Sequence, residues 1–228
     1  AIKIVELAEL KGQFRLQNYG LLETEDYLDQ INQAIQSTTL RIDVDRTSYL
    51  LKTLLREMGS KAKSAIVSIP AFSTFTTVLD MPLLPLKETE QAVGFQARQV
   101  IPLPPEKVSL DWSKIEETTN DRGQKFQKIL LIGIPTDVVE AYKQIVKSVG
   151  LRLVALELES FALIRSYLQP LAVAGGGGDK ATLYVDIGSL GTNMVVAHGA
   201  YMKYSDQRDH GALYLTHSLE ESLGISMS

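Results

Sequence analysis

The chain has 228 residues, 45% of them hydrophobic, which is enough for one large domain or two modest domains that bury their own cores. Its 27 acidic and 23 basic side chains give a net charge of -4, so no net positive field is available to bind nucleic acid. There is no cysteine, which excludes disulfides, thiolate nucleophiles and Cys-ligated metals and suits a cytoplasmic location. No apolar run reaches the roughly 18 residues that a membrane-spanning helix needs.

The first third of the chain predicts a hairpin followed by helices and a strand. Apolar residues nearly alternate on both sides of a turn at Lys11-Gly12, and later recur at intervals of three and four. Asp45 is the expected N-cap of the second helix and Gly59 its C-terminal stop, while Pro70 ends the last strand. The predicted elements are strands over 2–7, 14–19 and 65–69 and helices over 25–35 and 45–58.

The middle of the chain predicts an α+β module between about residues 76 and 156. Two proline-marked segments, Met81–Pro85 and Ile101–Pro105, are expected to be rigid loops at the two ends of one helix. A polar turn over 118–124 separates the two strands of a second hairpin. The predicted elements are strands over 76–80, 108–115, 126–134 and 151–156, helices over 87–100 and 136–149, and a further helix over 159–168.

The last part begins with four consecutive glycines, Gly175–Gly178, which predict a linker or hinge. They are not a P-loop, because no Gly-Lys-Ser/Thr sequence follows them and they precede a strand. The predicted elements after them are strands over 182–187, 193–197 and 200–204 and a helix over 212–223.

The most informative string runs from Asp186 to Thr192. An apolar strand ends in Asp186, a turn with Gly188 and Gly191 follows, and a second apolar strand begins at once. The backbone N–H groups of such a turn, with the hydroxyls of Ser189 and Thr192, can bind an anion, and Asp186 can hold a hydrated Mg²⁺. The alternative is a β-hairpin whose glycines only supply positive φ and whose aspartate caps the turn. An aspartate directly before Ile-Gly, after a buried strand, favours the nucleotide site.

This string resembles the second phosphate motif of the actin, hexokinase and Hsp70 ATPase superfamily. More narrowly, the chain resembles the PilM family of type IV pilus assembly proteins, relatives of FtsA. The matching segments run along nearly the whole chain in the family's order and comprise Ile2–Leu7, Val67–Pro70, Met81–Pro82, Glu90–Ile101, Leu110–Trp112, Gly150–Leu151, Glu157–Leu163 and Val185–Gly188.

Two departures from the family pattern concern the ends of the chain. The family's first phosphate loop is expected directly before Ile2-Lys3, and its adenosine-binding glycine motif after Ser228. The chain is therefore expected to correspond to the central two thirds of such a protein. An ATP site cannot be completed from these residues, so we expect the 228-residue chain to bind little or no ATP.

The resemblance implies an incomplete actin-like α/β fold. Its first domain is expected over residues 1–78 and 157–176, an inserted α+β subdomain over 79–156, and the start of a second domain over 180–228. It also implies a cytoplasmic, ATP-binding scaffold of type IV pilus assembly that uses Mg²⁺, with nucleotide contacts at Asp186, Gly188, Ser189, Gly191 and Thr192. Any ATPase activity of such a protein is expected to be weak at most, and the 228-residue chain is expected to be inactive.

The resemblance further implies that the cytoplasmic tail of the inner-membrane protein PilN recruits the scaffold to the membrane, where other platform proteins are partners. The proline-framed loops hold Leu83, Leu84 and Leu103, and Arg98 lies on the helix between them. We expect the PilN tail to bind these residues, at the junction of the insert and the first domain. The alternative is that the leucines pack onto the first domain and that Arg98 is solvated.

Other functions remain as alternatives. A sugar kinase of the same superfamily would need a general base beside the sugar hydroxyl, and the sequence offers no convincing candidate. A GspL-like scaffold of type II secretion would continue into a membrane helix. The three histidines lack metal-ligand spacing, and Glu157 and Glu159 are interpreted as a domain junction and helix start.

Overall fold

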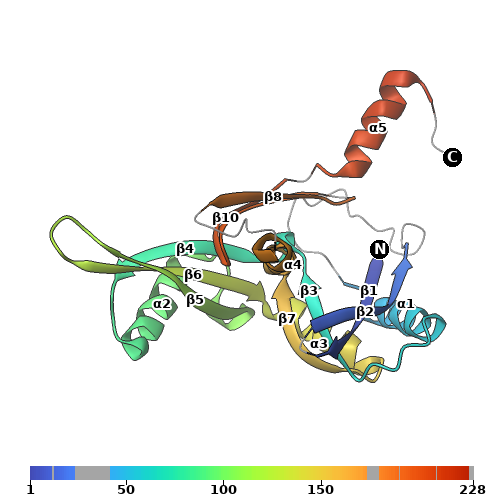
Figure 1. Cartoon of the computed structure of the whole chain (residues 1–228), viewed down its shortest axis with the longest axis horizontal. Coiled ribbons are helices and arrows are strands. Elements are labelled where there is room, and N and C mark those ends of the chain that lie inside the picture. Colours follow the sequence, from blue (N-terminus) through green and yellow to red (C-terminus); the bar gives the residue numbers. More distant parts are fainter. Residues whose placement is uncertain (12, 24–41, 174–179, 190, 209, 226–228) are drawn as a thin grey trace. The chain divides into compact units, whose positions relative to one another are not determined.

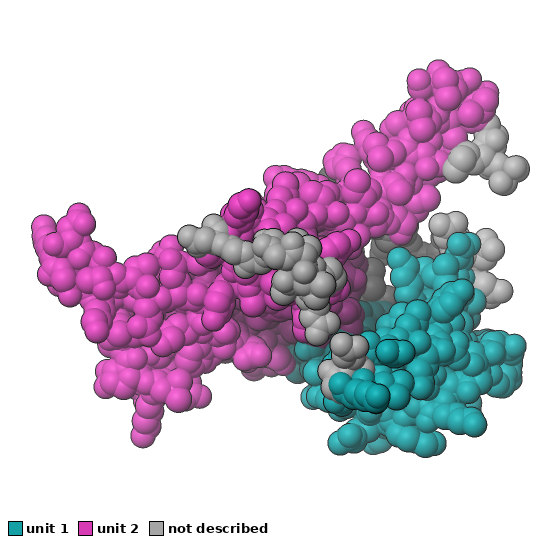
Figure 2. Space-filling view, in the orientation of Figure 1, with its two compact units in different colours: residues 1–67, 136–156 teal, residues 68–135, 157–228 magenta. Residues whose placement is uncertain are grey.

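The computed structural model describes all residues except 12, 24–41, 174–179, 190, 209 and 226–228. They form two compact units, one of residues 1–67 and 136–156 and the other of residues 68–135 and 157–228 (Figure 2). The helix predicted over 25–35 and the glycine run over 175–178 lie outside the described residues. The division into three domains, which concerns the family fold, stays a prediction.

The first unit opens with the predicted hairpin, made of β1 (Ile2–Leu10) and β2 (Gln13–Leu22) (Figure 1). Lys11 takes a positive φ of 53° in the turn. The helix α1 (Val44–Glu57) lies against β2 so closely that a Cβ atom on Gly20 would come within 2.5 Å of Met58 Sδ. A glycine in the strand therefore makes room for the helix.

The N-cap of α1 is Asp43, and the prediction of Asp45 is wrong. The backbone of Asp43 is extended, and its Oδ1 accepts a hydrogen bond of 2.9 Å from the N–H of Arg46. Asp45 lies in the first turn, where its charge favours the helix dipole. At the other end Gly59 has a φ of +62° and stops the helix as predicted.

The first unit also contains the helix α3 (Thr136–Ser148), which contacts α1. Most of a two-stranded sheet, formed by β3 (Ser64–Ile69) and β7 (Arg152–Leu158), belongs to this unit as well. The apolar face of α3 is buried through Val138, Val139, Ile145 and Val146. Gly150, with a φ of +77°, ends the α3 segment as predicted.

The second unit contains a sheet in the order β4-β6-β5, formed by β4 (Phe75–Pro82), β6 (Lys125–Pro135) and β5 (Val108–Thr119). The helix α2 (Leu86–Val100) packs on one face of this sheet. The expected loop over 81–85 is shorter than predicted, because Met81 and Pro82 still pair with β6. The buried core between α2 and the sheet consists of Leu79, Met81, Val93, Ala97, Ile101, Ile129 and Leu131.

A second sheet in this unit has the order β10-β9-β8, formed by β8 (Ala181–Ile187), β9 (Thr192–His198) and β10 (Tyr201–Arg208). The helices α4 (Glu159–Val173) and α5 (Ala212–Leu223) precede and follow it. Among the described helices none is both long and apolar enough to cross a membrane. The core that joins α4 to both sheets consists of Ile115, Leu130, Ile164, Tyr184, Val195, Ala197 and Met202.

Candidate functional site

The predicted phosphate-binding turn is a tight connection between β8 and β9. The N–H of Gly188 donates to the carbonyl oxygen of Gly191 at 2.9 Å and closes the turn. Gly188 is not among the glycines with a positive φ. A Cβ atom on Gly191 would lie 2.9 Å from the carbonyl oxygen of Arg208. Close backbone approach requires glycine at this position.

The start of α5 is packed directly onto this turn. The N–H of Ala212 donates to the carbonyl oxygen of Gly188 at 2.8 Å, and the N–H of Leu213 donates to that of Ser189 at 3.0 Å. A Cβ atom on Gly211 would come within 2.5 Å of three backbone atoms of the turn. The turn carbonyls therefore satisfy N–H groups of the first turn of α5 that have no partner within the helix.

The structure gathers the five predicted nucleotide residues at this turn and the adjoining strand ends. Asp186 and Ser189 are exposed, whereas the Thr192 hydroxyl donates to the carbonyl oxygen of His210 at 2.7 Å. The N–H of Gly188 is used within the turn. Nucleotide binding by these residues stays a prediction.

Sequence reasoning missed a polar row beside the turn. Asp186 pairs across the sheet with Asn193, and Asn193 pairs with Gln207, so the three side chains share one face of β8, β9 and β10. Asn193 is only 7% exposed. The only hint in the sequence is that the strand beginning at Asn193 opens with an amide, and the cross-strand register cannot be deduced from that alone.

Two oxygens of this row have no donor among the residues that the structure describes. Asn193 Nδ2 donates to Ser160 Oγ at 3.2 Å, but Asn193 Oδ1 and Gln207 Oε1 are buried without a hydrogen-bond partner among the described residues. Each of these two atoms has almost no accessible surface, so no water-sized group reaches it in the described structure. The described residues hold no group of three or more His, Cys, Asp or Glu for direct coordination.

The four residues predicted to bind a partner lie on α2 or next to its two ends. Leu83 and Leu84 are half-buried just before the helix; the N–H of Leu83 donates to the carbonyl oxygen of Lys125 at 3.0 Å. Arg98 is exposed in the last turn, and Leu103 packs against the core of α2 beyond its end. A helix of 15 residues is about 22 Å long, so an extended peptide needs about seven residues to contact both ends.

Two of the described ion pairs in the second unit join different elements. Lys203 Nζ lies 2.5 Å from Glu116 Oε2 and links β10 to β5. This hydrogen bond, with the charge of Lys203, lowers the pKa of the Glu116 carboxyl. Arg165 of α4 contacts both carboxylate oxygens of Glu157, which raises the pKa of Arg165. Glu157 is thus held in an ion pair at the start of α4.

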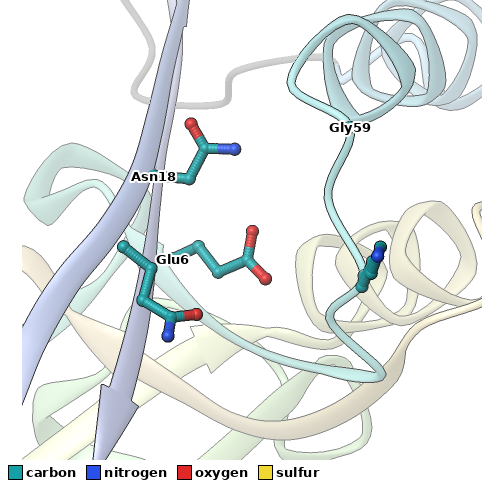
Figure 3. Close-up of a pocket in the computed structure, with 5 residues that line it drawn as sticks. Glu6, Asn18 and Gly59 are labelled. Carbon is teal, nitrogen blue, oxygen red and sulfur yellow. The ribbon is translucent and has the colours of Figure 1, made fainter.

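A polar pocket of about 400 Å³ lies in the first unit (Figure 3). The side chains of Glu6 and Asn18 point from the hairpin toward the segment that carries Gly59, and Asn18 Nδ2 donates to the carbonyl oxygen of Met58 at 2.7 Å. None of the residues predicted to bind nucleotide or partner lines it. The lining residues are Glu6, Gln17, Asn18, Gly59 and Lys61.

Comparison with known proteins identifies one family across the whole chain. The model of the family described as "Type IV pilus assembly protein PilM" matches residues 1–228. A chain of the solved "PilM-PilN type IV pilus biogenesis complex" superposes with a TM-score of 0.80 at 20% identity, covering 98% of this chain and 63% of that chain. This chain thus spans less than two thirds of the length of that structure.

A second solved structure is the cytoplasmic domain of EpsL, an inner-membrane component of the type II secretion system of Vibrio cholerae. Its TM-score is 0.52 at 11% identity, with 100% of this chain and 73% of that chain covered. At these identities the structures show the fold alone. The predicted α/β fold class is confirmed by the TM-score of 0.80 to the chain of the PilM-PilN complex.

Proposed function

Because the chain belongs to the family of the type IV pilus assembly protein PilM, we propose that it is a cytoplasmic scaffold that binds the PilN tail and a Mg²⁺–nucleotide. The family match over all 228 residues is the observation that carries this proposal. The proposed task of the scaffold is to couple nucleotide occupancy to contacts within the pilus assembly platform. PilN and other platform proteins would hold the scaffold at the inner membrane. A type II secretion scaffold has weaker support, since the TM-score to EpsL is 0.52 against 0.80.

The proposed PilN surface consists of the two loops that flank α2. The solved structure that matches 98% of this chain is a complex with PilN, which supports PilN as the partner. Leu83 and Leu84 at one end of α2 and Leu103 at the other offer apolar contacts, and Arg98 offers a cation. An extended tail segment can lie along α2 and contact both ends.

The proposed nucleotide site is the turn from Asp186 to Thr192. Mg²⁺, when bound, would neutralise phosphate charge. Asp186 would hold the hydrated ion beside the turn that contains Gly188 and Gly191. The hydroxyls of Ser189 and Thr192 are the proposed phosphate donors. For Thr192 this means exchanging its present hydrogen bond to His210.

The PilN surface is tested by titrating a fluorescent peptide of the PilN cytoplasmic tail, from the same organism, into the chain. Leu84→Glu is expected to abolish the anisotropy change, because a buried charge would replace an apolar contact. Leu103→Glu should act likewise, and Arg98→Glu, at an exposed position, should weaken binding with no effect on folding. Leu183→Glu is the matched control, since it puts the same charge on an exposed leucine of β8.

Circular dichroism shows whether each variant is folded. Peptide binding retained by folded Leu84→Glu, Leu103→Glu and Arg98→Glu would show that the tail binds elsewhere. Unfolding of both leucine variants, with full binding by Arg98→Glu, would show that the loops are only core.

A further inference from the structure

The free edge of strand β4 carries an inference that extends the proposed PilN surface and rests on that proposed function. β4 and β10 are edge strands of the two sheets in the second unit, and both of them line a slot of about 230 Å³. Leu130 of β6, which is buried and apolar, also lines the slot. The residues that the two edge strands contribute are 76–78 of β4 and 202–205 of β10.

The slot follows the edge of β4 rather than one face of the strand. Successive residues of a strand point to opposite faces of the sheet, yet three consecutive residues of β4, 76–78, line the slot. Among the described strands only β6 pairs with β4. The backbone groups that β4 directs away from β6 can therefore pair with one more extended segment.

β4 lacks the features that protect the other edge of its sheet. β5 has a register shift between Lys114 and Glu116 and carries several charged side chains. β4 pairs with β6 in an unbroken register, and Asp80 is its one charged residue. Charges and bulges hinder pairing with another chain, whereas a regular and largely uncharged edge favours it. β4 is therefore the edge of this sheet that is suited to strand addition.

The same edge leads to the proposed PilN surface. β4 is followed directly by Leu83 and Leu84, which lie just before α2. At the other end of β4, Phe75 pairs with Gly133, and a Cβ atom on Gly133 would lie 2.8 Å from the side chain of Ile101, the residue after α2. β4 and α2 thus extend between the same two ends of the sheet. An added strand of about eight residues reaches from the slot to Leu84.

We propose that an extended segment of the PilN tail adds a strand to the edge of β4 and places one apolar side chain in the slot. The main chain of the tail pairs with the outward backbone groups of β4, and Leu83 and Leu84 contact the next apolar side chains of the tail. A cavity of about 150 Å³ holds a benzene ring, so the slot has room for one leucine or phenylalanine side chain. Backbone pairing supplies affinity, and the slot selects the side chain.

The inference is tested with the wild-type chain and the fluorescent tail peptide, N-methylated at one backbone nitrogen at a time. An N-methyl group removes a donor and prevents pairing on that side of the peptide. Strand addition predicts an alternating pattern, in which N-methylation weakens binding about tenfold at every second residue and has little effect at the residues between them. Hydrogen exchange should slow at alternate amides of residues 76–80 when the unmethylated tail is bound.

Ser205→Trp tests the slot itself, because it fills the slot from β10 and leaves β4 unchanged. It is expected to weaken tail binding about tenfold, the loss that corresponds to one buried apolar side chain. Ser113→Trp is the matched control, since Ser113 is an exposed serine of β5, on the opposite edge of the sheet that contains β4. It should leave the affinity unchanged. Circular dichroism checks the fold, and if Ser205→Trp does not fold, Thr76→Trp fills the slot from β4.

The inference is overturned if the tail binds and tolerates N-methylation equally at all positions, or if a folded slot variant binds the tail like the wild type. Loss of binding in Leu84→Glu alone would then leave the proposed PilN surface standing without strand addition. A wild-type chain that does not bind the tail would contradict both the inference and the proposed PilN surface.

Discussion

Asp186 is the single charged side chain on which the nucleotide proposal depends most. It lies at the end of β8 beside the Gly188–Gly191 turn and is exposed. Asp186→Ala is expected to weaken Mg²⁺–ATP binding by the full-length protein by about 1–3 kcal/mol, the cost of losing a charge-assisted contact. Calorimetric titration measures the loss, and Asp121→Ala, in the exposed turn between β5 and β6, is the control. Equal affinities of wild type and Asp186→Ala would remove the residue from the site.

Gly211 tests whether α5 is locked to the same turn. A Cβ atom there would overlap three backbone atoms of the turn, which cannot move aside as a flexible side chain can. Gly211→Ala is expected to lower the free energy of unfolding by about 1–3 kcal/mol, as overpacking commonly does. It should also speed hydrogen exchange at the amides of Ala212 and Leu213, which now donate to the turn.

The control for Gly211 is a helical glycine with open space around it. Gly94 lies within α2, and a Cβ atom there would meet nothing within 4 Å. Gly94→Ala should raise stability by about 0.4–1 kcal/mol, because alanine restricts the unfolded chain. If Gly211→Ala is as stable as the wild type and its amides exchange as slowly, the packing described for the start of α5 is incorrect.

At the scale of the element, the N-cap of α1 distinguishes two neighbouring aspartates. Asp43→Ala removes the hydrogen bond to the Arg46 N–H and is expected to lower the free energy of unfolding by about 1 kcal/mol. Asp45→Ala removes only a favourable charge in the first turn and should cost less. Urea unfolding followed by circular dichroism measures both changes. A larger loss for Asp45→Ala would restore it as the N-cap.

The described elements could largely be predicted from periodicity, because apolar spacing and stop residues such as Gly59 act locally. The N-cap prediction of Asp45 in place of Asp43 is wrong because both aspartates lie within one helical turn and both satisfy the N-cap pattern. Only the backbone conformation decides between them. The expected strand over 76–80 ends before Pro82, because proline is typical of loops. Proline is tolerated at the end of β4 because β4 is an edge strand of its sheet.

The candidate site could be predicted only where its residues are close in sequence. The string from Asp186 to Thr192 is continuous, so its turn was visible. Asn193 and Gln207 come together through the register of β9 and β10, 14 positions apart, and neither residue type is unusual by itself. Gly211 likewise contacts the turn only through the path of the folded chain.

At the scale of the whole molecule, the units are assembled from distant segments. Residues 136–156 belong to the same unit as residues 1–67, and residues 157–228 belong to the same unit as residues 68–135. Long-range contacts of this kind have no local signal in the sequence. The order of many weak motifs along the chain did predict the family, and the family model over residues 1–228 confirms it.

The most direct test of the account is hydrogen exchange of the 228-residue chain with and without the PilN tail peptide. If the tail binds this surface, binding is saturable and exchange becomes slower at Leu83, Leu84 and Leu103 and along α2, whereas a scrambled peptide leaves exchange unchanged. Unchanged exchange at these positions, with the tail in saturating excess over the folded chain, would contradict the proposed scaffold function at this surface.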